Sequence, residues 1–156
     1  MQMVSDSASN WGDGGDLPSY ANCLVVDDNS FNMLAIQSVL EQFNIESDTA
    51  SDGIQAIELV KQRNKDKRDC YKLILLDYSM PNCDGVQTVK LLSKFMNTYM
   101  PLKKPPFICC ISAYSSNKYR VNATAAGMHY YLSKPVGKDA MRVVLEKAGL
   151  IAEEGK

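Results

Sequence analysis

The chain has 156 residues, of which 46% are hydrophobic and 22% are charged, and its formal net charge is −1. This length suffices for one ordinary domain with a proper core but not for two substantial domains. The near-neutral charge gives no support to nucleic-acid binding, and no apolar stretch approaches the roughly 18 residues of a membrane span, so we expect neither nucleic-acid nor membrane contact by this domain.

The five cysteines predict free thiols and not a disulfide framework. Their number is odd, and no pair has the CxxC spacing. Buried thiols in a reducing compartment are the simplest interpretation, so we expect a cytoplasmic domain. Zinc has no ligand set, because His129 is the only histidine.

The two ends of the chain lack any periodic pattern. Residues 1–20 are rich in Ser, Asp, Gly and Asn, with Trp11 as an exception, and we expect a flexible leader or linker there. Residues 151–156 are expected to form a disordered tail. The single domain should therefore span residues 21–150.

Between these ends, strands and helices are predicted to alternate. Short runs of apolar residues predict strands at about 22–26, 47–50, 72–76, 107–111 and 129–132. Apolar residues at helical spacing predict helices at about 30–43, from 53 onward, at 86–96, 117–126 and 138–148.

Two segments between these elements stand out. The basic stretch 61–68 is interpreted as a solvated helix end and loop, with a docking patch as the alternative. The segment 100–106 holds three prolines and must be a loop.

This alternation predicts an α/β fold, a doubly wound five-stranded parallel sheet flanked by five helices. We adopt the flavodoxin-like strand order 2-1-3-4-5, in which the first strand lies beside the third. In such sheets the ligand sits beyond the carboxyl ends of the strands.

Three acids fall at those ends. Asp27 and Asp28 follow the first strand, and Asp77 follows the third. Two carboxylates about 4 Å apart repel each other by roughly 4 kcal/mol at an effective dielectric constant near 20. A hard divalent cation relieves this repulsion, and Mg²⁺ binds through one or two carboxylates plus a phosphate. The cluster therefore predicts a Mg²⁺-dependent phosphoryl site.

Each group in this site has a physical task. Asp77 is the candidate nucleophile, which would form an aspartyl phosphate. The metal and the ammonium group of Lys134 would neutralise charge on the transferring phosphoryl group. Ser112 ends the fourth predicted strand, where its hydroxyl can donate to a phosphate oxygen.

At these residues the sequence resembles two-component response-regulator receiver domains. The resemblance covers about residues 21–149 and rests on four motifs, which are Asp27-Asp28-Asn29, Asp77-Tyr78-Ser79-Met80-Pro81 with Asp84-Gly85, Ile111-Ser112-Ala113 and Ser133-Lys134-Pro135. Residues 28–32 and the charged segment before the third strand resemble receivers attached to hybrid histidine kinases.

The resemblance implies a role for each matching position. Asp77 would accept phosphate from a histidine. Asp28, Asp77 and the backbone carbonyl of Ser79 would hold Mg²⁺, for which Mn²⁺ can substitute. Asp27 would reach the metal mainly through water.

The remaining matches imply a conformational switch. Ser112 would follow the phosphoryl group inward, and the rotamer of Tyr131 would report phosphorylation. The bond between Lys134 and Pro135 would be cis, as is usual in this family. Serine stands at 112 in place of the commoner threonine, which keeps the hydroxyl.

The resemblance also implies partners. The phosphodonor would be a histidine kinase or a histidine phosphotransfer protein, and the output would act on a downstream effector protein. Such a domain catalyses its own phosphoryl transfer and is not a conventional turnover enzyme. It is expected in the cytoplasm, either alone or as the cytosolic part of a larger membrane-bound kinase.

Other functions stay open as alternatives. A pseudo-receiver would keep the fold as an interaction module without accepting phosphate. A Mg²⁺ phosphatase would need a second Asp two residues after its nucleophile, where this chain has Ser79. A flavin carrier is disfavoured because Asp27 and Asp28 would repel its phosphate.

Overall fold

The computed structural model describes residues 20–153 of the chain. The expected leader lies outside the described residues, apart from Tyr20, and so does Trp11. Of the expected tail, residues 154–156 lie outside them.

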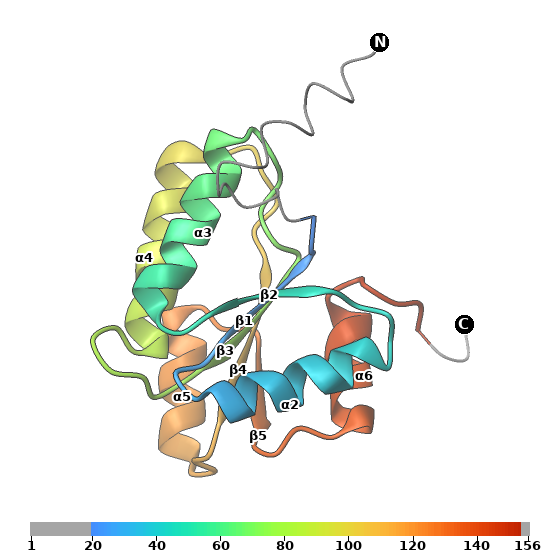
Figure 1. Ribbon diagram of the computed structural model, residues 1–156. Coiled ribbons are helices and arrows are strands. Elements are labelled where there is room, and N and C mark those ends of the chain that lie inside the picture. The colour runs from blue at the N-terminus through green and yellow to red at the C-terminus, as the bar shows by residue number, and fades with distance from the viewer. Residues whose placement is uncertain (1–19, 154–156) are drawn as a thin grey trace.

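A five-stranded parallel sheet forms the centre of the molecule (Figure 1). Its strands are β1 (Cys23–Val26), β2 (Ser47–Ala50), β3 (Leu73–Asp77), β4 (Phe107–Ser112) and β5 (Tyr130–Ser133). They are arranged in the order β2-β1-β3-β4-β5. This confirms the predicted fold class and strand order.

Five helices cover the two faces of the sheet. They are α2 (Ser30–Glu41), α3 (Gly53–Lys65), α4 (Gly85–Tyr99), α5 (Asn117–Ala126) and α6 (Lys138–Lys147). Helices α2 and α6 pack on one face, and α3, α4 and α5 lie side by side on the other (Figure 1). Within residues 20–153, no helix combines the length and the apolar character needed to span a membrane.

The core consists of two apolar layers, because successive strand residues point to opposite faces. One layer contains Leu24, Val26, Ile74 and Leu76 with residues of α3, α4 and α5. The other contains Cys23, Val25, Leu73 and Leu75 with residues of α2 and α6. Strands β1 and β3 are buried on both faces, which explains their uninterrupted apolar sequences.

Three polar side chains cap the helices that follow β1, β2 and β3. The Oδ1 atom of Asn29 accepts from the backbone N–H of Phe31 at 2.9 Å, at the start of α2. Asp52 and Asp84 accept in the same way at the starts of α3 and α4, each at 2.8 Å. These caps use backbone donors that no helical carbonyl can reach, so they hold the loops at the carboxyl edge of the sheet.

All five cysteines are free and buried in the described structure. Burial raises the pKa of the Cys70 thiol to about 11 and that of Cys110 to about 12. It also raises the pKa of Cys23 and Cys109. Cys23, Cys70, Cys109 and Cys110 are therefore protonated packing groups at neutral pH.

Candidate phosphoryl site

Three carboxylates meet at the carboxyl edge of the sheet, between β1 and β3. Asp77 is the last residue of β3, and Asp27 and Asp28 follow β1 directly. The pairing of Val26 with Leu76 places these ends side by side. One oxygen from each carboxylate lies within 4.8 Å of the others. Asp27 and Asp77 are buried, whereas Asp28 is exposed, so the cluster has a closed and an open side.

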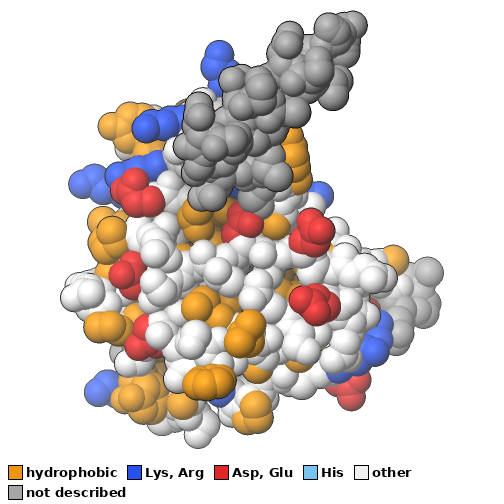
Figure 2. All heavy atoms as spheres, viewed as in Figure 1, with side chains coloured by type: hydrophobic (Ala, Val, Ile, Leu, Met, Phe, Trp, Pro, Cys, Tyr) orange, Lys and Arg blue, Asp and Glu red, His pale blue; other side chains and the backbone are white. Residues whose placement is uncertain are grey.

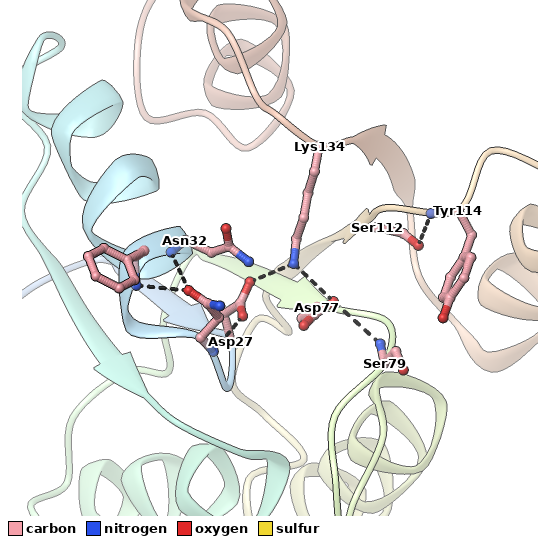
Figure 3. A network of polar contacts seen from close by, with 9 residues as sticks. Asp27, Asn32, Asp77, Ser79, Ser112, Tyr114 and Lys134 are labelled. Carbon is pink, nitrogen blue, oxygen red and sulfur yellow. Dashed lines mark hydrogen bonds and ion pairs between the residues drawn. The ribbon is translucent and has the colours of Figure 1, made fainter.

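Lys134 reaches into this cluster from the loop after β5 (Figure 3). Its Nζ atom lies 2.9 Å from Oδ2 of Asp27 and 3.4 Å from Oδ1 of Asp77. Its backbone N–H donates to the carbonyl of Ser112 at 2.9 Å, and its peptide bond to Pro135 is cis. The ammonium group therefore lies between the two buried acids.

The charges in this site shift the pKa of two groups. Burial, together with the neighbouring charge of Asp27, raises the pKa of Asp77 to about 6, although the ammonium group of Lys134 opposes this shift. Burial disfavours the charged form of Lys134, but its contacts with Asp27 and Asp77 outweigh burial and raise its pKa. Asp77 is thus a carboxylate that one lysine only partly neutralises.

The two oxygens of Asp27 have different polar contacts. Its Oδ1 atom accepts from the backbone N–H of Asn29 at 2.9 Å. Its Oδ2 atom is buried and makes no hydrogen bond to a described residue, so the ion pair with Lys134 is its polar contact. Buried carboxylate oxygens with unused lone pairs, beside an open Asp28, are the donors that Mg²⁺ prefers.

The side chains of Ser112 and Tyr131 both form hydrogen bonds with the backbone of Tyr114. The hydroxyl of Ser112, at the end of β4, accepts from the backbone N–H of Tyr114 at 3.0 Å (Figure 3). The hydroxyl of Tyr131 donates to the carbonyl of Tyr114 at 2.7 Å. The loop after β4 is therefore held by both predicted switch residues.

The part played by Tyr114 is not evident from the sequence, because it acts through backbone groups. Its side chain adds a second contact. The ring of Tyr114 stacks on that of Tyr119 in α5, with 4.5 Å between the ring centroids. The ring of Tyr119 packs edge-on against that of Tyr78, with 5.2 Å between the centroids. Three tyrosines thus join the loops after β3 and β4 to α5.

Ser79 borders the carboxylates, whereas His129, the only histidine, lies away from them. Ser79 is exposed, and its backbone N–H donates to Oδ1 of Asp77 over 3.4 Å, a long bond. His129 lies at the opposite edge of the sheet, where its Nδ1 atom accepts from the backbone N–H of Ile108 at 2.9 Å and its ring stacks on Phe107.

Comparison with known proteins identifies the family. The model of the family "Response regulator receiver domain" matches residues 23–146. This range contains all five strands and all five helices of the described structure except the last residue of α6.

Individual relatives agree with this match. The chain is 31% identical over 135 residues to hybrid signal transduction histidine kinase E of Dictyostelium discoideum, an alignment that covers 85% of the chain and 7% of that protein. It is 33% identical over 125 residues to the transcriptional regulatory protein ZraR of Escherichia coli O157:H7, covering 80% of the chain and 25% of that protein. The chain thus spans a quarter or less of the length of these relatives.

A solved structure shows the same fold. The receiver domain of the histidine kinase CKI1 from Arabidopsis thaliana, determined as a D1050A mutant, superposes with a TM-score of 0.68 at 21% identity. The match covers 80% of this chain and 89% of that one.

Proposed function

The chain belongs to the response regulator receiver domain family, and on this premise we propose that it accepts a phosphoryl group on Asp77 in a His–Asp phosphorelay. The family places the chain in two-component signal transduction. The observation that carries the proposal is the arrangement of Asp77, which is buried beside Asp27 and within 3.4 Å of Lys134.

The proposed reaction is a nucleophilic displacement at phosphorus. A carboxylate oxygen of Asp77 attacks the phosphorus of a phosphohistidine, an O–P bond forms, and the P–N bond breaks. The electron pair of that bond stays on the imidazole nitrogen, which takes up a proton. The ammonium group of Lys134 neutralises negative charge on the phosphoryl oxygens, which lowers the barrier.

The carboxylates would hold Mg²⁺ or, in its place, Mn²⁺. Asp28, Asp77 and the backbone carbonyl of Ser79 would be ligands, and Asp27 would act mainly through water. The buried Oδ2 atom of Asp27, whose polar contact is the ion pair with Lys134, and the open position of Asp28 support this assignment. When bound, the cation would supply positive charge beside the phosphoryl oxygens.

The proposed output is a shift between two arrangements of the loop after β4. A phosphoryl group on Asp77 would attract the hydroxyl of Ser112, which in the described structure accepts from Tyr114. Movement of this loop would also break the bond between Tyr131 and Tyr114 and change the surface near α5. Phosphorylation would thus bias an existing equilibrium.

The proposed donor is a histidine kinase or a histidine phosphotransfer protein. His129 cannot serve as the donor in this domain, because it lies at the edge of the sheet opposite Asp77 and its Nδ1 atom is already bonded. The phosphohistidine would come from another protein or from sequence outside this chain, and the target of the output would be an effector protein.

The proposal is tested by mass spectrometry after incubation with acetyl phosphate and Mg²⁺. We expect the mass of the unmodified chain to increase by one phosphoryl group and that of Asp77→Asn to stay constant. Asp66→Asn is the matched control, because Asp66 is an exposed acid beyond the end of α3 and should leave phosphorylation intact. Equal labelling of Asp77→Asn would contradict the assignment of Asp77. No labelling of any variant would instead favour a pseudo-receiver.

A further inference from the structure

A large hollow lies at the amino ends of the strands, on the side of the sheet opposite the phosphoryl site. Its volume is about 1130 Å³, and residues at the starts of β1, β3, β4 and β5 contribute to its wall. The two segments that the receiver function leaves unexplained both line it, namely the end of the basic stretch 61–68 and the proline-containing segment 100–106.

This hollow is strongly basic. Among the described residues of its wall, seven are Lys or Arg and one, Asp69, is an acid, although the whole chain has a net charge of −1. Besides Arg63, the basic residues are Lys67, Arg68, Lys72, Lys103, Lys104 and Lys147. Figure 2 shows Lys and Arg side chains near the ends of α3 and α4, at this end of the molecule. We refer to this set as the basic hollow.

Four of the seven cations have structural reasons to be there. Lys103 pairs with Asp69 at 2.9 Å, and the guanidinium group of Arg68 lies over the ring of Tyr20. The guanidinium group of Arg63 is buried, lies over the ring of Tyr71 and pairs with Asp48 at 3.5 Å. Lys147 lies in the last turn of α6, where a positive charge stabilises the helix dipole.

The other three, Lys67, Lys72 and Lys104, lie outside any helix, and we call them the loop lysines. Lys67, Lys72 and Lys104 are exposed and form no ion pair with a carboxylate in the described part of the chain. Gathering like charges around one hollow costs free energy unless an anionic group offsets it.

The chain itself contains a segment with the required charge. Residues 1–19 include Asp6, Asp13 and Asp16 and no Lys or Arg. Tyr20, which follows this segment, is part of the hollow's wall. Four extended residues span at most about 14 Å, so an aspartate at position 16 is within reach of the rim. Tethering at the rim gives an effective concentration in the millimolar range, at which weak contacts suffice.

We propose that the acidic segment Asp6–Asp16 binds in the basic hollow of its own chain. Its aspartates would pair with the loop lysines, and the indole of Trp11 would contact the apolar wall formed by residues such as Leu102 and Pro105. Leu102 is 98% exposed in the described structure, so its side chain is open to contact by an aromatic ring.

Trp11 provides the test, because it is the only tryptophan in the chain. We expect its fluorescence to show a blue-shifted maximum and high anisotropy in the unmodified chain. The double substitution Lys67→Glu with Lys104→Glu should shift the maximum to longer wavelength and lower the anisotropy. Lys118→Glu is the matched control, because Lys118 is an exposed lysine on α5 and should leave both signals unchanged.

A salt titration of the unmodified chain keeps the test independent of mutant folding. The screening length falls from about 10 Å at 0.1 M to about 3 Å at 1 M, so salt should produce the same shift as the double substitution. The signal should not change with protein concentration, because the contact lies within one chain.

Three results would overturn the proposal. They are a fully solvated Trp11 signal in the unmodified chain, an equal response to Lys118→Glu, and a signal that rises with protein concentration, which would indicate contact between molecules. The measurement needs no phosphodonor, so its outcome is independent of the phosphorylation test.

Discussion

At the scale of single residues, Asp77 carries an electrostatic cost in the described structure. Burial and the charge of Asp27 raise the pKa of Asp77 from its ordinary value of 3.8 to about 6. A raised carboxyl pKa means that the folded state holds the proton more tightly than the unfolded chain does. The protonated carboxyl of Asp77 therefore contributes fully to the free energy of unfolding below about pH 3.8. This contribution is lost as the pH rises through about 6.

Asp77→Asn should for this reason stabilise the protein when divalent cations are removed. Two pKa units correspond to about 3 kcal/mol, and solvent on the open side of the site reduces the expected gain to about 1–2 kcal/mol. Urea unfolding in EDTA at pH 5 and pH 8 measures it, and the gain should be larger at pH 8. A variant with the same stability and pH slope as the unmodified protein would contradict this account.

Asp28 should matter for metal binding and little for folding, because its carboxylate is exposed. We expect Asp28→Ala to weaken Mg²⁺ binding about tenfold or more, which corresponds to at least about 1.4 kcal/mol. Calorimetric titration of Mg²⁺ measures the effect, with Asp66→Ala as a control acid outside the site. Unchanged affinity in Asp28→Ala would point to other ligands.

At the level of elements, the start of α4 packs tightly against the end of β3. A Cβ atom added to Gly85 would lie 2.6 Å from the backbone oxygen of Asp77 and 3.1 Å from the Cα atom of Tyr78. Both neighbours are backbone atoms, so the loop that follows Asp77 would have to move.

Gly85→Ala should therefore destabilise the protein by about 1–3 kcal/mol and slow phosphorylation as well. Gly137→Ala is the control for crowding, because nothing lies within 4 Å of its added Cβ atom; Gly137 is the N-cap of α6, so the substitution should cost less than about 1 kcal/mol. Urea unfolding compares the two variants. Equal losses of stability in the two variants would show that the close approach of Gly85 to the backbone of Asp77 does not cause the destabilisation.

The bounds of the strands and helices can be compared with those predicted from the sequence. The predicted strands fall within one residue of the observed bounds, because apolar runs between charged loops mark them clearly. The helix predicted at 86–96 continues to Tyr99, since no residue before Pro101 interrupts it. The helix predicted at 30–43 ends at Glu41, where the chain turns so that Asn44 adopts a positive φ of 59°.

At the site, the sequence indicated the side chains but not the backbone contacts. Asp27, Asp28, Asp77 and Lys134 could be predicted because charged residues after apolar strands are conspicuous. The bonds from Ser112 and Tyr131 to the backbone of Tyr114 could not, because every residue has the same backbone groups. The stacking of Tyr119 likewise depends on how α5 packs.

The whole molecule should respond to metal through its stability. A ligand that binds only the folded state raises the free energy of unfolding by about 2.7 kcal/mol at one hundred times its Kd. We expect Mg²⁺ to have this effect on the unmodified chain, as measured by thermal unfolding at increasing concentrations. Asp28→Ala should require a correspondingly higher concentration, and an unchanged midpoint in the unmodified chain would argue against a metal site.

Because every cysteine is buried, the reactivity of the thiols reports local and global unfolding of the domain. Because each thiol is buried in the folded domain, an alkylating reagent can modify it only after local or global exposure. The mass spectrum of a partly alkylated sample would then separate molecules that have opened one region from those that have opened completely, without any introduced label.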